Sequence, residues 1–180
     1  HASCAPTPAP SVIDLTRALD HELCFEDCVM QDNVGGMDAT LLNGATCTPG
    51  EGVVFDGVDD YVDLEDQLLG GEMTIALYIR WDALNHWARA LGFGNGEADN
   101  IFIANREEAT SDNIRFGVLV DYSSLVAPDP AGLIVLGAWT HVVATTQGTS
   151  MQLYQDGTVL SSTDAGQEAA SMTRANYWLG

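Results

Sequence analysis

The chain contains no lysine. Six arginines are its only strongly basic residues, against 26 acidic ones, which gives a formal net charge of −20 over 180 residues. Without lysine there is no side-chain amine for a Schiff base and no P-loop lysine for a nucleotide phosphate. Binding to a phosphate backbone needs clustered basic side chains, whereas these arginines are scattered along the sequence. We therefore expect no nucleic acid among its partners.

Long hydrophobic runs and helical patterns are also scarce. The longest apolar stretches, such as residues 132–138, fall far short of the roughly 20 residues that a membrane-spanning helix needs. We therefore expect no membrane span. Only residues 11–19, with Ser11 as the N-cap, have a pattern compatible with a short helix. A hydrophobic content of 46% is sufficient for the core of one domain.

Cysteine is confined to the first quarter of the chain, at positions 4, 24, 28 and 47. An even, clustered set favours disulfide bonds formed in an oxidising compartment, so we predict a secreted, extracellular or cell-surface protein. We expect Cys28–Cys47 to tie the first strand to a strand around residues 53–55, and Cys4 to pair with Cys24. The alternative is a zinc site in which Cys24 and Cys28 form one ligand pair, although such sites usually carry two short-spaced pairs.

From residue 52 onward, apolar and polar side chains alternate with the period of a β-strand. Residues 73–81 and 114–120 show this alternation clearly. Turn signals separate such segments, and Asp156-Gly157 predicts a hairpin between residues 151–155 and 158–162. Many short strands and 18 glycines are typical of an all-β protein. We predict a two-sheet antiparallel β-sandwich.

The first residues differ in composition from the rest. Residues 1–11 alternate proline with small side chains, which keeps a chain extended. We interpret them as a linker or stalk, and residues 12–180 as one β-sandwich domain with a disulfide-bonded N-terminal segment.

Several segments resemble, in order and spacing, those of laminin G-like domains. The segments are 53–62 (VVFDGVDDYV), 90–94 (ALGFG), 139–145 (WTHVVAT), 153–157 (LYQDG) and 176–180 (NYWLG). The resemblance implies the concanavalin A-like jelly roll, in a pentraxin-related, lectin-like superfamily. Members of that family normally continue with a loop and a final strand. The resemblance therefore implies a fold that lacks its last strand here, either as a fragment of a longer protein or with the sheet completed by another segment or subunit.

Glycoside hydrolases share this jelly roll, so the catalytic pattern matters. Their retaining members resemble one another in an E-x-D-x-x-E strand that places three carboxylates on one face. The nearest match here is Glu97-x-Asp99-x-x-Phe102, in which phenylalanine replaces the third carboxylate. His141 lies within an alternating strand pattern, where a packed residue is a commoner role than a catalytic base. We expect no catalytic residue and no enzyme activity.

Calcium is the metal that the sequence favours, because hard cations take oxygen ligands from loops. Two loops are rich in such ligands, one with Asp56, Asp59 and Asp60 and the other with Asn95, Glu97, Asp99 and Asn100. The second loop is similar to the Asp-Asn pair that opens the calcium site of pentraxins, so we name its four residues as candidate ligands. The alternative is that these side chains only form turns.

Sugar binding would use exposed aromatic side chains beside hydrogen-bonding groups. The candidates are Trp87, Arg89, Asn113 and Tyr122. The acidic composition argues against anionic ligands such as heparin or sulfated glycans.

Together these features predict a non-catalytic extracellular recognition or assembly module. It would bind a glycan or an extracellular protein in a lectin-like manner, with calcium as a candidate cofactor. The main alternative is a structural subunit of an extracellular filament or matrix, with neighbouring copies as partners in a homo-oligomer. An accessory domain of a carbohydrate-active enzyme is a further alternative.

Overall fold

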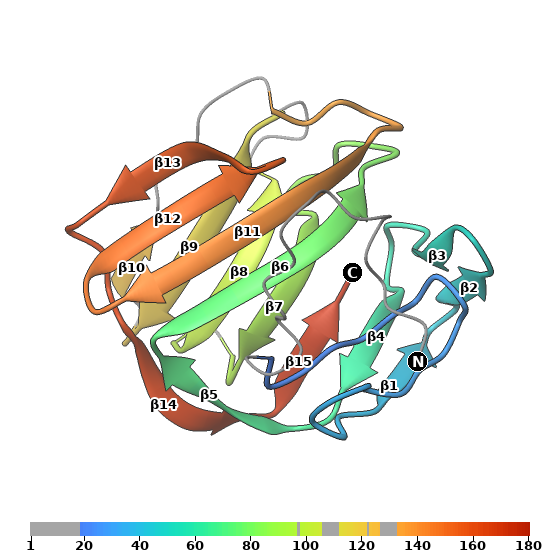
Figure 1. Cartoon of the computed structure of the whole chain (residues 1–180), viewed down its shortest axis with the longest axis horizontal. Coiled ribbons are helices and arrows are strands. Elements are labelled where there is room, and N and C mark those ends of the chain that lie inside the picture. Colours follow the sequence, from blue (N-terminus) through green and yellow to red (C-terminus); the bar gives the residue numbers. More distant parts are fainter. Residues whose placement is uncertain (1–18, 97, 106–111, 122, 127–132) are drawn as a thin grey trace, which may run out of the picture. The chain divides into compact units, whose positions relative to one another are not determined.

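The computed structural model describes residues 19–96, 98–105, 112–121, 123–126 and 133–180. These residues form strands and turns (Figure 1), and none of them lies in a helix. Accordingly, this part of the chain has no helix long and apolar enough to cross a membrane. The expected linker and Cys4 lie outside the described residues, as does nearly all of the expected helix at 11–19. The chain forms two compact units, His1–Glu65 and Asp66–Gly180.

The first unit contains four short strands in two antiparallel pairs. They are β1 (Ala39–Leu42), β2 (Thr46–Thr48), β3 (Gly52–Val54) and β4 (Tyr61–Leu64). Strand β1 pairs with β4, and β2 pairs with β3 as a hairpin. The hairpin turns at Gly50, whose φ of 83° lies in the left-handed region that glycine adopts without steric cost.

A disulfide bond joins Cys28 to Cys47, as predicted, with the two Cα atoms 5.6 Å apart. Cys47 lies on β2, opposite Val53 of β3. Cys28 lies in a turn before β1 and not in the first strand, contrary to the expectation from the sequence. The turn is closed by a hydrogen bond from the backbone N–H of Cys28 to the carbonyl of Phe25 (3.1 Å). Cys24 is also disulfide-bonded. None of these three described cysteines is therefore free to bind zinc.

The Asp32 carboxylate organises the segment that precedes β1. Its side chain is inaccessible to solvent and lies 2.6 Å from Nδ1 of His21. It accepts hydrogen bonds from the backbone N–H groups of Glu22 (2.8 Å), Val34 (2.8 Å) and Met37 (3.2 Å). Burial alone would raise the pKa of Asp32, but these hydrogen bonds outweigh it and hold the pKa well below its usual range. The segment thus depends on an ionised carboxylate.

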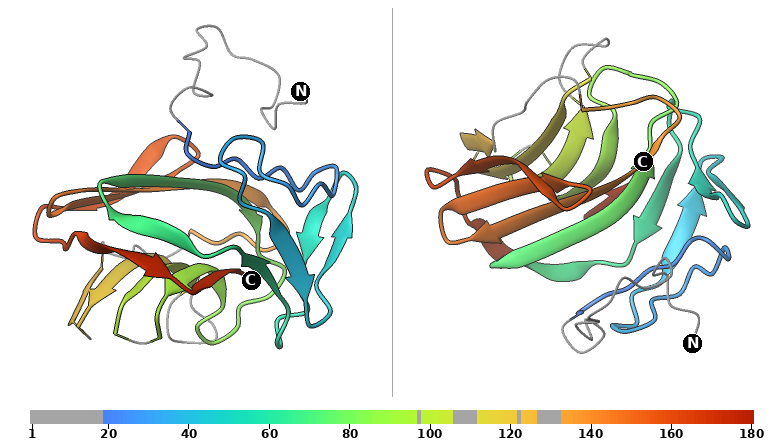
Figure 2. Two further views of the ribbon diagram at one scale, coloured as in Figure 1. Left: turned by 90° about the horizontal axis from the view of Figure 1, so that it is seen from below. Right: turned by 45° about the horizontal axis from the view of Figure 1, so that its top comes forward.

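The second unit contains the remaining strands, all paired antiparallel. In chain order they are β5 (Gln67–Gly71), β6 (Met73–Arg80), β7 (Arg89–Gly94), β8 (Asn100–Asn105), β9 (Ile114–Val120), β10 (Ser123–Val126), β11 (Trp139–Gln147), β12 (Ser150–Gln155), β13 (Thr158–Thr163), β14 (Ala169–Arg174) and β15 (Asn176–Leu179). One sheet has the order β13-β12-β11-β6, and a second includes β15-β7-β8-β9-β10. Figure 2 shows these two sheets as facing layers.

The space between the two sheets is the hydrophobic core. Alternate residues of β8, β9, β11 and β12 point into it and are at most 1% exposed: Ile101, Ile103, Asn105, Ile114, Phe116, Val118, Val142, Ala144, Met151 and Leu153. The alternation predicted for residues 73–81 and 114–120 appears as β6 and β9, and the predicted hairpin as β12 and β13. The fold is therefore the predicted all-β, two-sheet antiparallel sandwich with the jelly-roll architecture.

A buried arginine links the two-stranded sheet β14-β5. Arg174 is 0% exposed, and its guanidinium donates hydrogen bonds to the carbonyls of Leu69 on β5 and Ala170 on β14. Desolvation lowers the pKa of Arg174. The following turn is held by Asn95, whose side chain donates to the carbonyl of Thr173 (2.9 Å) and accepts from the N–H of Ala175 (2.9 Å). These contacts fix the start of β15 beside the end of β7.

Candidate functional site

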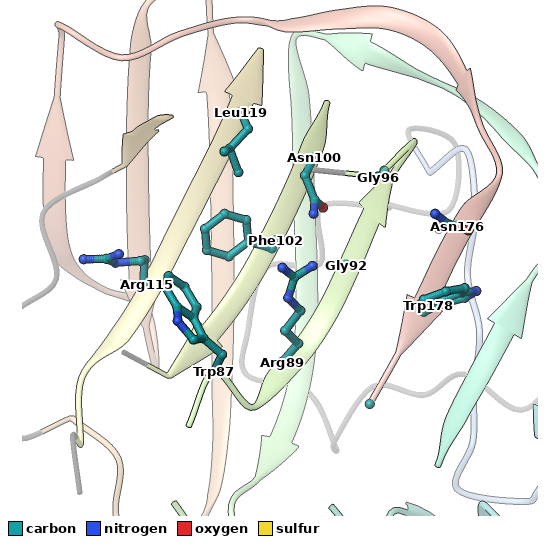
Figure 3. A pocket seen from close by; sticks show the side chains of 12 residues that line it. Trp87, Arg89, Gly92, Gly96, Asn100, Phe102, Arg115, Leu119, Asn176 and Trp178 are labelled. Carbon is teal, nitrogen blue, oxygen red and sulfur yellow. The ribbon is translucent and has the colours of Figure 1, made fainter. Parts of the chain in front are cut away.

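A groove of about 570 Å³ lies on the outer face of the second sheet, the face turned away from the core. The strand register places two rows of residues across this face. In order from β15 through β7 and β8 to β9, the first row is Trp178, Gly92, Phe102 and Gly117, and the second is Asn176, Gly94, Asn100 and Leu119. Figure 3 shows the groove with the side chains that line it. Large side chains thus alternate with glycines across the floor.

The glycines provide the space in which the larger side chains lie. A Cβ atom at Gly117 would stand 2.3 Å from the Phe102 ring. At Gly94 it would stand 2.7 Å from the backbone carbonyl oxygen of Asp99 and 3.0 Å from Cγ of Asn100, and at Gly92 it would stand 3.1 Å from Nη1 of Arg89. None of these glycines has a positive φ, so the reason for glycine is room and not backbone conformation. Three glycines on one face let Phe102, Asn100 and Arg89 lie across the sheet.

Trp87 borders the groove from a turn that precedes β7. Its φ is 54°, a conformation that costs a bulky residue about 1–3 kcal/mol and is typical of functional positions. The turn is closed by the hydrogen bond from the N–H of Ala88 to the carbonyl of Asn85 (3.3 Å) and anchored by buried Asn105, whose N–H donates to Ala88 (2.9 Å). The Trp87 ring meets Phe102 edge to face, with centroids 6.1 Å apart.

Two arginines lie against these aromatic rings. The guanidinium of Arg89 lies 5.4 Å from the centre of the Phe102 ring, and that of Arg115 lies 5.6 Å from Trp87. Both distances are within the range of cation–π attraction. The contacts of Arg89 remove part of it from water, and this desolvation lowers its pKa. The lining residues that the structure describes include no acidic side chain, so the groove is positive within an acidic protein.

Asn100 is the buried polar group of the groove. The residue is only 8% exposed, and its Oδ1 has no hydrogen-bond partner among the described residues. Leaving such a group unsatisfied costs about 1–3 kcal/mol. Figure 3 shows the amide of Asn100 and the guanidinium of Arg89 turned toward one another beside Phe102. A ligand hydroxyl placed between them would supply the missing partner.

The structure brings together two of the four residues expected to bind sugar. Trp87 and Arg89 line the groove, whereas Asn113 is buried and is not part of the lining. Tyr122 lies outside the described residues. Sequence reasoning missed Phe102 and Trp178 as groove residues. The signal was present, because each alternates with a core residue on its own strand.

The described residues of the expected calcium loop, between β7 and β8, make contacts with other parts of the protein. The side chain of Asn95 is hydrogen-bonded to the turn between β14 and β15. Asn100 points into the groove, and the carbonyl of Asp99 accepts from the N–H of Asn95 (2.9 Å). Glu97 lies outside the described residues. Asn95 and Asn100 therefore face different neighbours.

The other acidic loop brings its carboxylates closer together. Oxygen atoms of Asp56, Asp59 and Asp60 lie within 4.8 Å of one another. They also form the turn, since Asp60 accepts from the N–H of Asp56 (2.9 Å) and Asp56 accepts from the N–H of Val58 (2.8 Å). The turn-forming role proposed as the alternative is thus present in the structure.

His141 lies on the outer face of the other sheet. Its ring packs against Tyr78 of β6 with centroids 4.7 Å apart, and its backbone N–H donates to the carboxylate of Asp156 (3.0 Å). Within the described residues, the groove lining contains no histidine, cysteine or carboxylate that could act as nucleophile or base. The side chains described there can bind a ligand, by stacking and hydrogen bonding.

Solved structures share this fold at low sequence identity. Domain 4 of AbnA, a GH43 extracellular arabinanase from Geobacillus stearothermophilus solved with arabinotriose, is 17% identical with a TM-score of 0.68, covering 87% of this chain and 80% of its own. The carbohydrate-binding module CBM66 from Bacillus subtilis is 16% identical with a TM-score of 0.51, covering 78% and 85%. Domains LG4-5 of the mouse laminin alpha1 chain are 19% identical with a TM-score of 0.51, covering 64% and 29%.

No curated protein matches the chain in sequence. A laminin G family model, described as the concanavalin A-like lectin/glucanases superfamily, matches residues 56–180. That match spans well over half of the chain and includes every residue that lines the groove. The chain therefore belongs to the concanavalin A-like lectin/glucanase superfamily.

Proposed function

We propose that this protein is a non-catalytic, extracellular carbohydrate-binding module, and that a saccharide binds in the groove of the second sheet. The observation that carries the proposal is the combination of aromatic surface with an unsatisfied buried amide. Trp178, which is 40% exposed, and Trp87 stand on either side of a floor formed by Phe102, which is only 3% exposed, and Asn100 offers its amide between them. Aromatic faces pack against the C–H groups of a sugar ring, and polar groups pair with its hydroxyls.

Two further observations support a binding role over a catalytic one. The described lining lacks the carboxylate pair that glycoside hydrolysis requires. Structures with the same fold include a domain solved with arabinotriose and a carbohydrate-binding module. The extracellular location is supported by the disulfide between Cys28 and Cys47, which is typical of oxidising compartments.

The test compares two tryptophans of similar exposure. Trp178 is 40% exposed in the groove, and Trp139 is 51% exposed on β11 of the other sheet. Affinity gel electrophoresis against a panel of plant and bacterial polysaccharides would first identify a ligand. Trp178→Ala should then weaken binding at least tenfold, which corresponds to about 1.4 kcal/mol. Trp139→Ala should bind as the original chain does.

The proposal would be wrong if no polysaccharide of the panel retarded the protein. It would also be wrong if Trp139→Ala abolished binding while Trp178→Ala left it unchanged, since the ligand would then lie on the other sheet.

A further inference from the structure

We infer that the saccharide in the groove is acidic, and that it carries isolated carboxylate groups, such as a uronate unit among neutral sugars, which Arg89 binds. This inference rests on the proposed function and names the class of its ligand. It runs against the overall charge of −20, which by itself disfavours anionic ligands. Binding of an anion depends on where the few positive charges lie.

Arg89 is placed to bind an anion. Its guanidinium lies over Phe102, and no carboxylate of the described residues lies within ion-pair distance of it. Arg80, by contrast, is paired with Asp82 at 3.0 Å and lies over Trp139 on the other sheet. In an acidic protein, an arginine kept away from carboxylates on an aromatic floor is available to a ligand. A planar guanidinium can bind both oxygens of a carboxylate at once.

The amide of Asn100 completes the site. It is buried, turned toward Arg89 and unpartnered at Oδ1. Gly94 and Gly92 leave the space that Asn100 and Arg89 occupy. An amide can accept from a sugar hydroxyl while Arg89 donates to the carboxylate of the same ring. The pair therefore suits a ring that carries both a hydroxyl and a carboxylate.

Arg115 contributes less directly. Figure 3 shows it extending from β9 at the edge of the groove, beyond Trp87. Its guanidinium lies 5.6 Å from the Trp87 ring, so it helps to position that ring and adds positive charge nearby. One central cation favours one carboxylate at a time. Densely sulfated chains would instead meet the surrounding acidic surface.

The experiment uses polysaccharides with isolated uronates, each paired with its carboxyl-reduced form. Glucuronoxylan, highly methyl-esterified pectin and a glucuronate-bearing arabinogalactan form the acidic set, and heparin and dextran sulfate form the sulfated set. We expect at least one acidic polysaccharide to bind at least tenfold more tightly than its reduced form. Arg89→Gln should abolish that difference, and Arg89→Lys should restore only part of it because lysine lacks the planar fork.

Two matched variants serve as controls. Arg80→Gln removes an equal charge on the other sheet and should leave binding unchanged, whereas Arg115→Gln should weaken it less than Arg89→Gln does. Equal binding of acidic and reduced forms would overturn the inference and leave the proposed function standing. Binding to the sulfated set alone, or uronate binding that survives Arg89→Gln, would also overturn it. Failure of every polysaccharide would refute both.

Discussion

Gly117→Ala tests whether glycines shape the groove floor. The added Cβ would stand 2.3 Å from Cζ and 2.5 Å from Cε1 of Phe102, where ordinary contacts begin near 3.4 Å. The ring must therefore retreat by about 1 Å. It has the core behind β8 and Trp87 beside it, so the open direction is into the groove.

The expected cost follows from that displacement. Overpacking a close-packed site by one carbon typically costs about 1–3 kcal/mol. For a chain of this length each kcal/mol lowers the melting temperature by about 2–4 °C, so the expected decrease is about 2–12 °C. The displaced ring also disturbs the position of Arg89, whose guanidinium lies over it, and saccharide affinity should fall together with stability.

Thermal unfolding and affinity electrophoresis would measure the two effects. Ala76→Val is a suitable control, because Ala76 is exposed on β6 and a β-branched side chain is well tolerated there. If Gly117→Ala melted and bound like the original protein, Phe102 would not be confined as the structure has it. Glycine at position 117 would then not be what shapes the groove floor.

Two further predictions concern carboxylates. The pKa of Asp32 is depressed in the folded protein, so its contribution to stability is present above the unfolded pKa of about 3.9 and is lost as the pH falls through the folded value. The melting temperature should therefore drop below about pH 4, and Asp32→Asn should make that drop smaller. An acid unfolding profile that Asp32→Asn left unchanged would contradict the prediction. Calcium, at fixed ionic strength, should raise the melting temperature. At a calcium concentration a hundred times the dissociation constant, the free energy of unfolding should increase by about 2.7 kcal/mol. Asp99→Ala should abolish this rise if the β7–β8 loop binds the ion, and Asp59→Ala should abolish it if the cluster of Asp56, Asp59 and Asp60 does. A melting temperature that does not change with calcium concentration would mean that both loops only form turns.

The fold was predictable where the physics is local. Strand β6 alternates an inward Leu77 with an outward Tyr78, and the Asp-Gly turn between β12 and β13 has its own chemical signature. The segment before β1 was not predictable in this way. It is held by hydrogen bonds to the Asp32 carboxylate, and no periodic pattern marks a residue whose role is to accept them.

The site was predictable only in part, for a related reason. Trp87, in a turn, and Arg89, at the start of β7, stand out in the sequence because one is aromatic and the other is among only six basic residues. Phe102 and Trp178 do not, because their place in the groove depends on pairing between strands that are far apart in the chain. The alternation of apolar and polar residues along one strand identifies which residues face outward. It cannot identify which outward residues meet.

Charge illustrates the same difference between composition and arrangement. The net charge of −20 describes the whole chain, but exposed charges beyond about 8 Å are largely screened at physiological ionic strength. A bound ligand is governed by the charges that touch it. Two of the four described arginines, Arg89 and Arg115, line the groove, and no described acidic residue does. Distant carboxylates would slow the approach of an anionic saccharide without opposing its contacts once bound. The composition therefore bears on the rate of association, and the groove on the identity of the ligand.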